Sequence, residues 1–408
     1  MGFEFSNIPA HWCVRKMPEV VKWGSGGTPK ATESAYYENG TIPWLIIGDL
    51  NDGVVTESAT KITKLGLENS SAKMIPAGTL LVAMYGSIGK LGITGVECCT
   101  NQAIAYVKQL HGVTTKFMFY YMVLIKPELI SMGKGGTQKN ISQTVLNSLL
   151  VPIPPIEEQE RIVARIEELF SELDNGVETL RKTKQQLAVY RQAVLKEAFD
   201  KAGEKQVPLR GIIEKPRYGT SKKCSYDIDE HSLAVYRIPN INYFQGTISH
   251  DDLKYASFTE DEFDSLKLRS GDILIIRSNG SVSLVGRSAI VAEEDTYGLF
   301  AGYLMRLRIK VEAEILPQYL NLYLSTHYAR YQIEQMARST SGVNNINSDE
   351  ICRICLPVCG IDLQKEIIRE IEARLSVCDS IEKTVDTTLQ QAEAMRQSIL
   401  KQAFEGRL

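Results

Sequence analysis

The sequence predicts an α/β (α+β) protein: two globular regions separated by two long antiparallel coiled-coil helices, internally duplicated with pseudo-two-fold symmetry. Three observations lead to this fold class. The segment RQAVLKEAF at 191–199 recurs as RQSILKQAF at 396–404. Each copy ends a stretch of more than forty residues that contains no Pro and is rich in helix-forming residues. Each stretch follows a region in which short apolar runs alternate with turn residues, as they do in mixed domains.

The length and the order of these segments divide the chain into four parts. A chain of 408 residues is too long for one ordinary hydrophobic core. We expect a first globular domain at 1–150 and a central helix at 151–206. We expect a second globular domain at 207–355 and a C-terminal helix at 356–408.

The repeat extends well beyond the two matching nonapeptides. An offset of 205 residues aligns the two copies without a gap from Pro152 and Pro357 to Phe199 and Phe404. Identical pairs within this span include Ile162/Ile367, Gln159/Gln364, Asp174/Asp379 and Arg191/Arg396. The offset also matches Asn140 with Asn345 and Ile141 with Ile346, within the segments QKNIS (138–142) and NNINS (344–348). The globular regions are therefore related as well, although they have diverged far more than the helices.

Apolar residues recur in both helices with a heptad spacing, which is typical of a coiled-coil seam. The expected seam residues are Ile162, Ile166, Leu169, Leu173, Leu180, Leu187, Ile367, Ile371, Ile381, Val385 and Ile399. Gly176 and Arg374 interrupt this pattern, so we expect imperfect packing near them. At a rise of 1.5 Å per residue, each helix would be about 60 Å long.

Short strand-like runs and helical stretches occur in the same order in both globular regions. The strands are expected at 42–47, 78–84 and 103–108 in the first region, and at 234–241, 271–277 and 303–309 in the second. The helical stretches are expected at 115–125 and at 317–336. The order strands, helix, linker and long helix thus occurs twice.

The bulk composition restricts the function. The net charge is −3, whereas a stand-alone, salt-driven nucleic-acid binder usually has a clear basic excess. No apolar run is long enough to span a membrane. The opening residues lack the basic and apolar segments of a signal peptide, and the eight cysteines have no framework spacing. We therefore expect a cytoplasmic protein with reduced thiols.

Motifs for catalysis and metal binding are missing. YGSIGK (85–90) has two residues between its Gly and its Gly-Lys pair, whereas a P-loop needs four. Cys352, Cys355 and Cys359 have no His nearby in sequence, so we expect no metal. We find neither a nuclease-type carboxylate cluster nor the Asn-Pro-Pro-aromatic motif of amino-methyltransferases. We expect no catalytic residue and no cofactor in this chain.

The chain resembles the specificity (S) subunits of type I restriction–modification systems over essentially all of its length. The first helix begins with VPIPPIEEQERIV (151–163), and the second copy departs from the family's usual PIPP-x-x-EQ by reading LPVCGIDLQ. The other segments that carry the resemblance are the two nonapeptides, GGTPK (26–30) with YYENGTIPWL (36–45), RIPNI (237–241) with GTI (246–248), and GDILIIRSNGS (271–281).

The resemblance implies a non-catalytic subunit that recognises double-stranded DNA within a larger complex. Two methyltransferase subunits would dock on the helices for adenine methylation, and two restriction/translocase subunits would join them for cleavage. S-adenosylmethionine, ATP and Mg would belong to those partners. The two globular regions differ, so an asymmetric bipartite target is expected, with the coiled coil setting the distance between its halves.

Recognition of DNA needs amide, cationic and hydroxyl side chains on loops that rigid strands hold. Six Gly-containing loops fit this description, three in each globular region, at 24–30, 84–90, 133–140, 215–223, 277–287 and 338–347. The residues expected to contact DNA are Lys30, Tyr36, Tyr37, Tyr85, Ser87, Lys90, Lys134, Gln138, Lys139, Asn140, Arg217, Tyr218, Lys222, Lys223, Arg277, Asn279, Ser281, Arg287, Asn344 and Asn345. We expect Arg277 to read a base edge.

Two other classes of function remain open. A pseudo-symmetric coiled-coil scaffold, whose globular halves bind proteins, would agree with the charge balance and the heptads. The paired polar loops argue against it. A self-sufficient nuclease or methyltransferase is disfavoured by the missing motifs.

Overall fold

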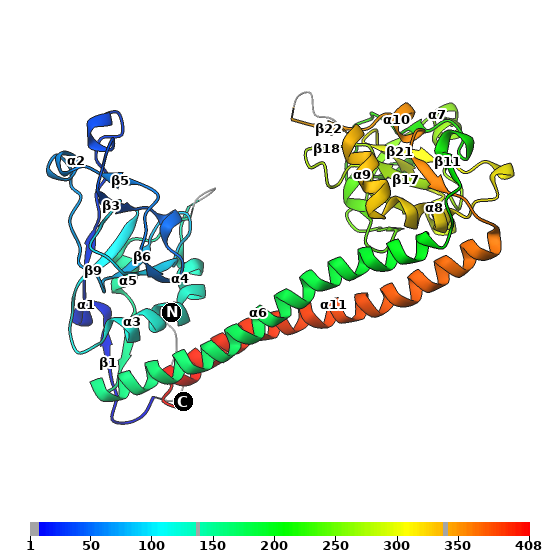
Figure 1. The fold of residues 1–408 in the computed structure, drawn as a ribbon. Helices are drawn as coiled ribbons and strands as arrows, with labels where there is room; N and C mark the ends of the chain where they lie inside the picture. The colour runs from blue at the N-terminus through cyan, green and yellow to red at the C-terminus, as the bar shows by residue number, and fades with distance from the viewer. Residues whose placement is uncertain (1–7, 136–138, 338–341) are drawn as a thin grey trace. The chain divides into compact units, whose positions relative to one another are not determined.

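The computed structural model describes residues 8–135, 139–337 and 342–408 (Figure 1). The chain forms two compact units, Met1–Leu180 with Thr387–Leu408, and Arg181–Asp386. Each unit contains one globular region and part of both long helices, α6 (Ile156–Asp200) and α11 (Ile361–Phe404). The boundaries between the units therefore lie inside the two long helices and not at their ends. The four sequential domains expected above remain a prediction.

The first globular region is built on two sheets. The larger has the order β2-β9-β6-β7-β4, in which only β4 and β7 are parallel. The strands are β2 (Val21–Ser25), β4 (Gly53–Val55), β6 (Leu80–Ala83), β7 (Leu91–Thr94) and β9 (Ile104–Leu110). The smaller sheet joins β5 (Lys61–Ile62), β3 (Ile42–Leu45) and β8 (Cys99–Thr100). The strands expected at 42–47, 78–84 and 103–108 are thus confirmed.

The helices of the first region are short, and α3 and α4 cover its core. They are α1 (Met17–Val20), α2 (Lys64–Glu68), α3 (Thr115–Leu124), α4 (Lys126–Met132) and α5 (Gln143–Asn147). Thr114 caps α3 by accepting a hydrogen bond from the Phe117 amide. A two-stranded pair, β1 (Cys13–Lys16) with β10 (Leu150–Ile153), leads directly into α6.

The second globular region repeats this plan with other strand pairings. A four-stranded antiparallel sheet joins β12 (Arg217–Tyr218), β21 (Leu304–Leu307), β17 (Ile273–Ile276) and β19 (Ser288–Ile290). A second sheet joins β16 (Lys254–Ser257), β13 (Ser232–Tyr236) and β20 (Leu299–Phe300). The run expected as one strand at 234–241 is interrupted by a 3-10 turn at Ile238–Asn240, which has Pro at its second position. Its last residue begins β14 (Ile241–Asn242), which pairs with β15 (Thr247–Ile248).

The remaining elements of this region connect it to the helices. They are β11 (Gln206–Pro208) paired with β23 (Cys355–Pro357), β18 (Ser278–Asn279) paired with β22 (Asn344–Asn345), α7 (Glu260–Leu266), α8 (Pro317–Leu324), α9 (His327–Met336) and α10 (Ser348–Ile351). The helix expected at 317–336 is two helices, because Thr326 caps α9 by accepting from the Ala329 amide.

A buried glutamine attaches each long helix to its globular region in the same way. Gln159 Nε2 donates to the carbonyl oxygens of Gly112 and Pro154, and its Oε1 accepts from the Thr114 amide. Gln364 Nε2 donates to Glu314 and Cys359, and its Oε1 accepts from the Leu316 amide. Gly112 and Glu314 both have positive φ, of 70° and 48°. The duplication therefore extends to a local backbone conformation that the sequence alignment does not show.

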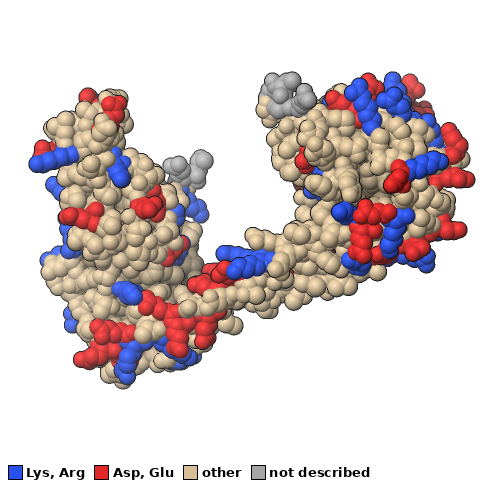
Figure 2. Space-filling model, viewed as in Figure 1, with Lys and Arg blue, Asp and Glu red and all other residues tan. Residues whose placement is uncertain are grey.

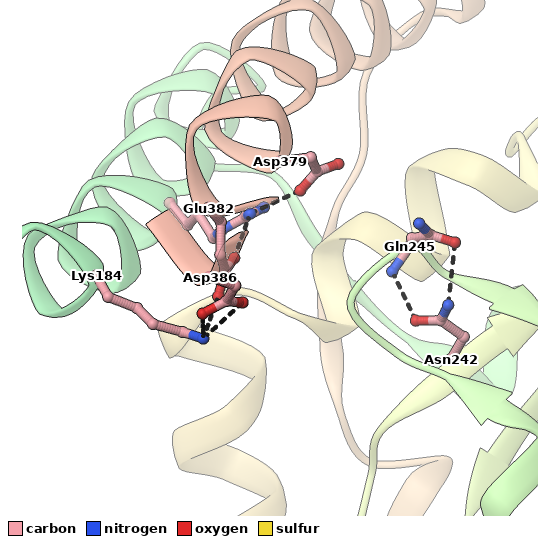
Figure 3. Close-up of polar contacts among 7 residues, drawn as sticks. Lys184, Asn242, Gln245, Asp379, Glu382 and Asp386 are labelled. Carbon is pink, nitrogen blue, oxygen red and sulfur yellow. Dashed lines mark hydrogen bonds and ion pairs between the residues drawn. The ribbon is translucent and has the colours of Figure 1, made fainter. Parts of the chain in front are cut away.

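The two long helices run antiparallel and pack against each other within each unit. In the first unit Arg396 forms an ion pair with Asp174. In the second, Arg191 donates to Asp379 at 2.6 Å and to Glu382 at 3.0 Å, and Lys184 donates to Asp386 at 2.8 Å. Figure 3 shows Lys184, Asp379, Glu382 and Asp386 on the facing sides of α6 and α11. Partners further along α6 thus lie earlier on α11.

The expected seam residues differ in burial. Ile162, Ile166, Ile367, Ile371 and Val385 are buried. Leu169, Leu173, Leu180, Leu187 and Ile399 are half-buried. Ile381 is 40% exposed, so its placement in the seam is wrong. The next residue, Glu382, faces the other helix instead, where it accepts a hydrogen bond from Arg191 at 3.0 Å.

The irregular packing expected at Gly176 and Arg374 is present. No atom lies within 4 Å of where a Cβ of Gly176 would be, and a groove of about 280 Å³ opens beside this residue. Arg374 donates to Glu197 at 2.8 Å and lies over the ring of Tyr190. An arginine at a seam position is thus accommodated by a salt bridge and an aromatic face rather than by apolar contacts.

Candidate nucleic-acid interface

In the first globular region, the loops at 84–90 and 133–140 lie against each other. The Gly86 amide donates to Lys139 O at 3.1 Å, and the Ile141 amide donates to Met84 O at 2.9 Å. Asn140 forms bridges with both Tyr85 and Lys134. Backbone hydrogen bonds hold these loops, so their side chains remain available to a ligand.

The second region joins its corresponding loops in the same way. β18 pairs with β22, which places Ser278 opposite Asn345 and Asn279 opposite Asn344. The Ile346 amide donates to Arg277 O at 2.9 Å, as Ile141 does to Met84. The Asn344 side chain also donates to Gly280 O at 2.9 Å.

A third loop joins each pair. Gln143 Nε2 donates to Ser25 Oγ at 3.1 Å in the first region, and the Ser348 amide donates to the Tyr218 hydroxyl at 2.9 Å in the second. A Cβ on Gly26 or Gly219 would collide with the carbonyl oxygens of the neighbouring strand end, so only Gly fits at these two positions. The structure thus brings together the three loops expected in each region.

Many of the expected contact residues have exposed side chains on these loops. Those that are exposed are Lys30, Tyr85, Ser87, Lys134, Lys139, Arg217, Tyr218, Lys222, Lys223, Ser281 and Asn345. Those that are half-buried include Tyr36, Asn140, Arg277, Asn279 and Asn344. Gln138 and residues 338–341 of the last loop lie outside the described residues.

Two of the lysines expected to contact DNA donate hydrogen bonds to other residues of this chain. Lys222 Nζ donates to Glu262 at 2.6 Å and to Ser257 O at 2.8 Å. Lys90 Nζ donates to the carbonyl oxygens of Ile47 and Gly48, each at 3.3 Å. These contacts brace the loops and leave less of each cation's hydrogen-bonding capacity for DNA.

Three more expected residues have similar partners. Arg287 donates to Ser283 O at 3.2 Å and lies over the Tyr243 ring, and burial lowers the pKa of its guanidinium. The Tyr37 hydroxyl donates to Pro29 O at 2.6 Å, and burial raises the pKa of this tyrosine. Lys30, which is exposed, pairs with Glu33 at 3.3 Å.

A polar pocket of about 490 Å³ opens beside Arg277 in the second region. Its lining includes Arg353, which follows α10 and lies outside all six expected loops. No local pattern marks Arg353 in the sequence, because only the fold brings the segment after α10 next to the end of β17.

We also searched the described residues for metal sites and for membrane-spanning helices. Across residues 8–135, 139–337 and 342–408, no cluster of three or more His, Cys, Asp or Glu side chains is arranged to hold a metal ion. None of the helices formed by these residues combines the length and low charge needed to cross a membrane. Figure 2 shows Lys and Arg interspersed with Asp and Glu on the visible face of each globular region.

Comparison with known proteins gives consistent matches. A family model described as the type I restriction modification DNA specificity domain matches residues 9–187. The EcoKI specificity subunit of Escherichia coli strain K12 is 24% identical, with 98% of this chain and 90% of that protein aligned. The StySPI specificity subunit of Salmonella potsdam is 22% identical over the same shares.

Solved structures confirm the predicted fold. One chain, from work on complex assembly and conformational transition of the type I R-M system, matches with a TM-score of 0.77 at 17% identity. The match covers 98% of this chain and 99% of that one. The HsdS subunit from Thermoanaerobacter tengcongensis matches with a TM-score of 0.54 at 17% identity, covering 98% of each chain.

Proposed function

We propose that the chain is a specificity subunit of a type I restriction–modification system, like the proteins it is similar to. We propose further that its two globular regions recognise the two halves of an asymmetric bipartite DNA target. In this role the chain itself is non-catalytic. It directs a methyltransferase to adenines in the target.

One observation carries this proposal: the same three-loop arrangement occurs in both regions with different side chains. Ser25 and Tyr218 correspond because their hydroxyls accept from Gln143 and Ser348, which the offset of the repeat aligns, from the side chain in one case and the backbone in the other. Met84 and Arg277 correspond because their carbonyl oxygens accept from the amides of Ile141 and Ile346. A shared framework with unlike side chains suits two surfaces that recognise unlike base sequences. The scaffold alternative offers no reason for polar loops to meet at the same place twice.

The assembly follows from the same family membership. We propose that two methyltransferase subunits dock on α6 and α11 and that two restriction subunits join them for cleavage. S-adenosylmethionine, ATP and Mg²⁺ belong to those subunits in this proposal. The duplicated helices support it, since a chain built from two equivalent halves can offer two equivalent docking surfaces.

The test is to express this chain with its methyltransferase partner in a host that lacks other adenine methylation and to map methylated adenines by single-molecule sequencing. We expect one asymmetric motif with two specified halves separated by unspecified bases. With the Tyr218→Ala variant, the methylated motif should lose base specificity in one of its halves and keep it in the other. A copurifying complex without any methylated motif would favour the protein-binding scaffold.

A further inference from the structure

We infer that the pocket beside Arg277 binds a phosphate group of the DNA backbone between Arg277 and Arg353, so that Arg277 positions the DNA and does not read a base edge. This inference rests on the proposed function, which supplies DNA as the ligand. It replaces the role that the sequence alone suggested for Arg277.

Residues from several elements of the second region line this pocket. Arg277 comes from the end of β17, and Arg353 follows α10. The rest of the lining comes from the end of α9, from β22 and the residues after it, and from α10: Gln335, Met336, Asn345, Ile346, Asn347 and Glu350. A volume of about 490 Å³ is ample for a phosphate group and part of its sugar.

Arg277 is held in place with donors to spare. Its backbone amide donates to Tyr303 O at 2.9 Å, and its guanidinium Nη1 donates to Gly302 O at 3.0 Å. The guanidinium carbon lies 4.7 Å from the centre of the Tyr218 ring. The Nε atom is buried and has no hydrogen-bond partner among the described residues. The side chain is thus already oriented. No described residue accepts from its Nη2, so the donors of this group remain for a phosphate oxygen.

The charges of the pocket favour an anion over a neutral base. Arg353 is exposed, and no described residue forms a hydrogen bond or ion pair with its guanidinium. The only carboxylate in the lining is that of Glu350, whose Oε2 accepts from the Asn347 amide at 2.8 Å. Two guanidinium groups therefore share the pocket with one carboxylate. A phosphate diester carries one negative charge and two non-bridging oxygens that can accept from the planar guanidinium fork, so it would neutralise the excess, whereas a base edge would not.

In the first region, uncharged residues correspond to the two arginines of this pocket. Met84 corresponds to Arg277, since Ile141 and Ile346 make the same backbone hydrogen bond to them. Ser148 corresponds to Arg353 by the offset of the repeat. Neither counterpart carries a charge, so only the second region has this phosphate contact.

The experiment measures the affinity of the assembled complex of this chain and its methyltransferase partner as a function of KCl concentration. The probes are a duplex carrying the target found by methylation mapping and an unrelated duplex of equal length. Arg353→Gln should weaken binding to both duplexes by the same factor, and the slope of log K against log [KCl] should become less steep by about 0.9. Arg353→Lys, which keeps the charge, should retain most of the slope.

Arg269→Gln is the matched control. Arg269 is also an exposed arginine of the second region, but it precedes β17 whereas Arg277 follows it. Because the two ends of a strand are separated by its full length, Arg269 lies away from the pocket, and Arg269→Gln should bind as the wild type does. In addition, a single methylphosphonate should be placed at each position of the second region's half of the target in turn. At one position it should weaken binding of the wild type more than binding of Arg353→Gln, which keeps only the Arg277 contact.

Two outcomes would overturn the inference. A loss confined to the target duplex would assign Arg353 to base recognition, and an unchanged salt slope would show that no phosphate is contacted there. A wild-type complex that bound both duplexes equally would count against the proposed function itself. The experiment can therefore refute the phosphate site at this pocket without refuting the proposed DNA recognition.

Discussion

The ring of Phe404, the last residue of α11, lies 4.8 Å from the ring of Phe117 in α3, and both side chains are fully buried. In the second unit the ring of Phe199 lies 5.0 Å from that of Tyr319 in α8. Phe199 and Phe404 are the final residues of the two repeated nonapeptides. The repeat therefore places an aromatic residue at or next to the C-terminal end of each long helix, where it packs in the core of a globular region. The C-terminal helix completes the first region.

Phe404→Ala should destabilise the first unit selectively. Removing a buried phenylalanine ring costs about 3–5 kcal/mol, because the cavity fills only in part. Hydrogen exchange measured by mass spectrometry should show faster exchange in α3 and unchanged exchange in α8. Gln402→Ala, an exposed residue two positions earlier, should change neither helix. Equal loss of protection in both units would contradict this assignment.

Replacing Gln159 by Leu should also destabilise the first unit. The leucine would leave the Thr114 amide and the Gly112 and Pro154 carbonyls without their partner. A buried polar group left unsatisfied costs about 1–3 kcal/mol. Urea denaturation should show a lower midpoint for Gln159→Leu. Gln364→Leu should give a comparable loss in the second unit, and Gln185→Leu, at an exposed helix position, should be close to neutral.

The contact between Arg191 and Asp379 should contribute measurably to the helix pair. Burial alone would lower the pKa of Arg191, but its hydrogen bonds and ion pairs with Asp379 and Glu382 outweigh burial and raise it. A double-mutant cycle with Arg191→Ala and Asp379→Ala should give a coupling of about 1 kcal/mol that falls as salt is added. The exposed pair Lys64–Glu68, at 3.7 Å, is the control and should couple by about 0.3–0.5 kcal/mol. Equal coupling in both pairs would argue that burial adds nothing at Arg191.

Cys98 and Cys99 should resist alkylation in the folded protein. Burial is the main cause that raises the pKa of Cys98 to about 12 and that of Cys99 to about 11. The reactive thiolate is then a very small fraction of either residue at pH 8. Peptide mapping after iodoacetamide treatment should find Cys13, which is exposed, modified first. Early modification of Cys98 would show that this part of the first region opens readily.

The sequence predicted the repeating parts of the structure well. Heptads, the absence of Pro and the offset of the repeat predicted both long helices, because helix periodicity is local. It misplaced Ile381, because a heptad frame cannot tell which seam position gives way to a salt bridge such as that of Arg191 with Glu382. The expected loops do meet, but the sequence did not show that some of their cations, such as Lys222 with Glu262, are paired within the protein.

By itself, the sequence determined that this protein is a duplicated pair of globular regions and long helices with polar loops at matching places. Only the tertiary structure decided which residues share a site. Arg277 and Arg353 lie on segments with no common local pattern, and the folding of β17, β22 and α10 against one another brings them to one pocket. Periodicity and composition are properties of neighbouring residues along the chain, whereas a binding pocket depends on long-range contacts between segments that the chain keeps apart.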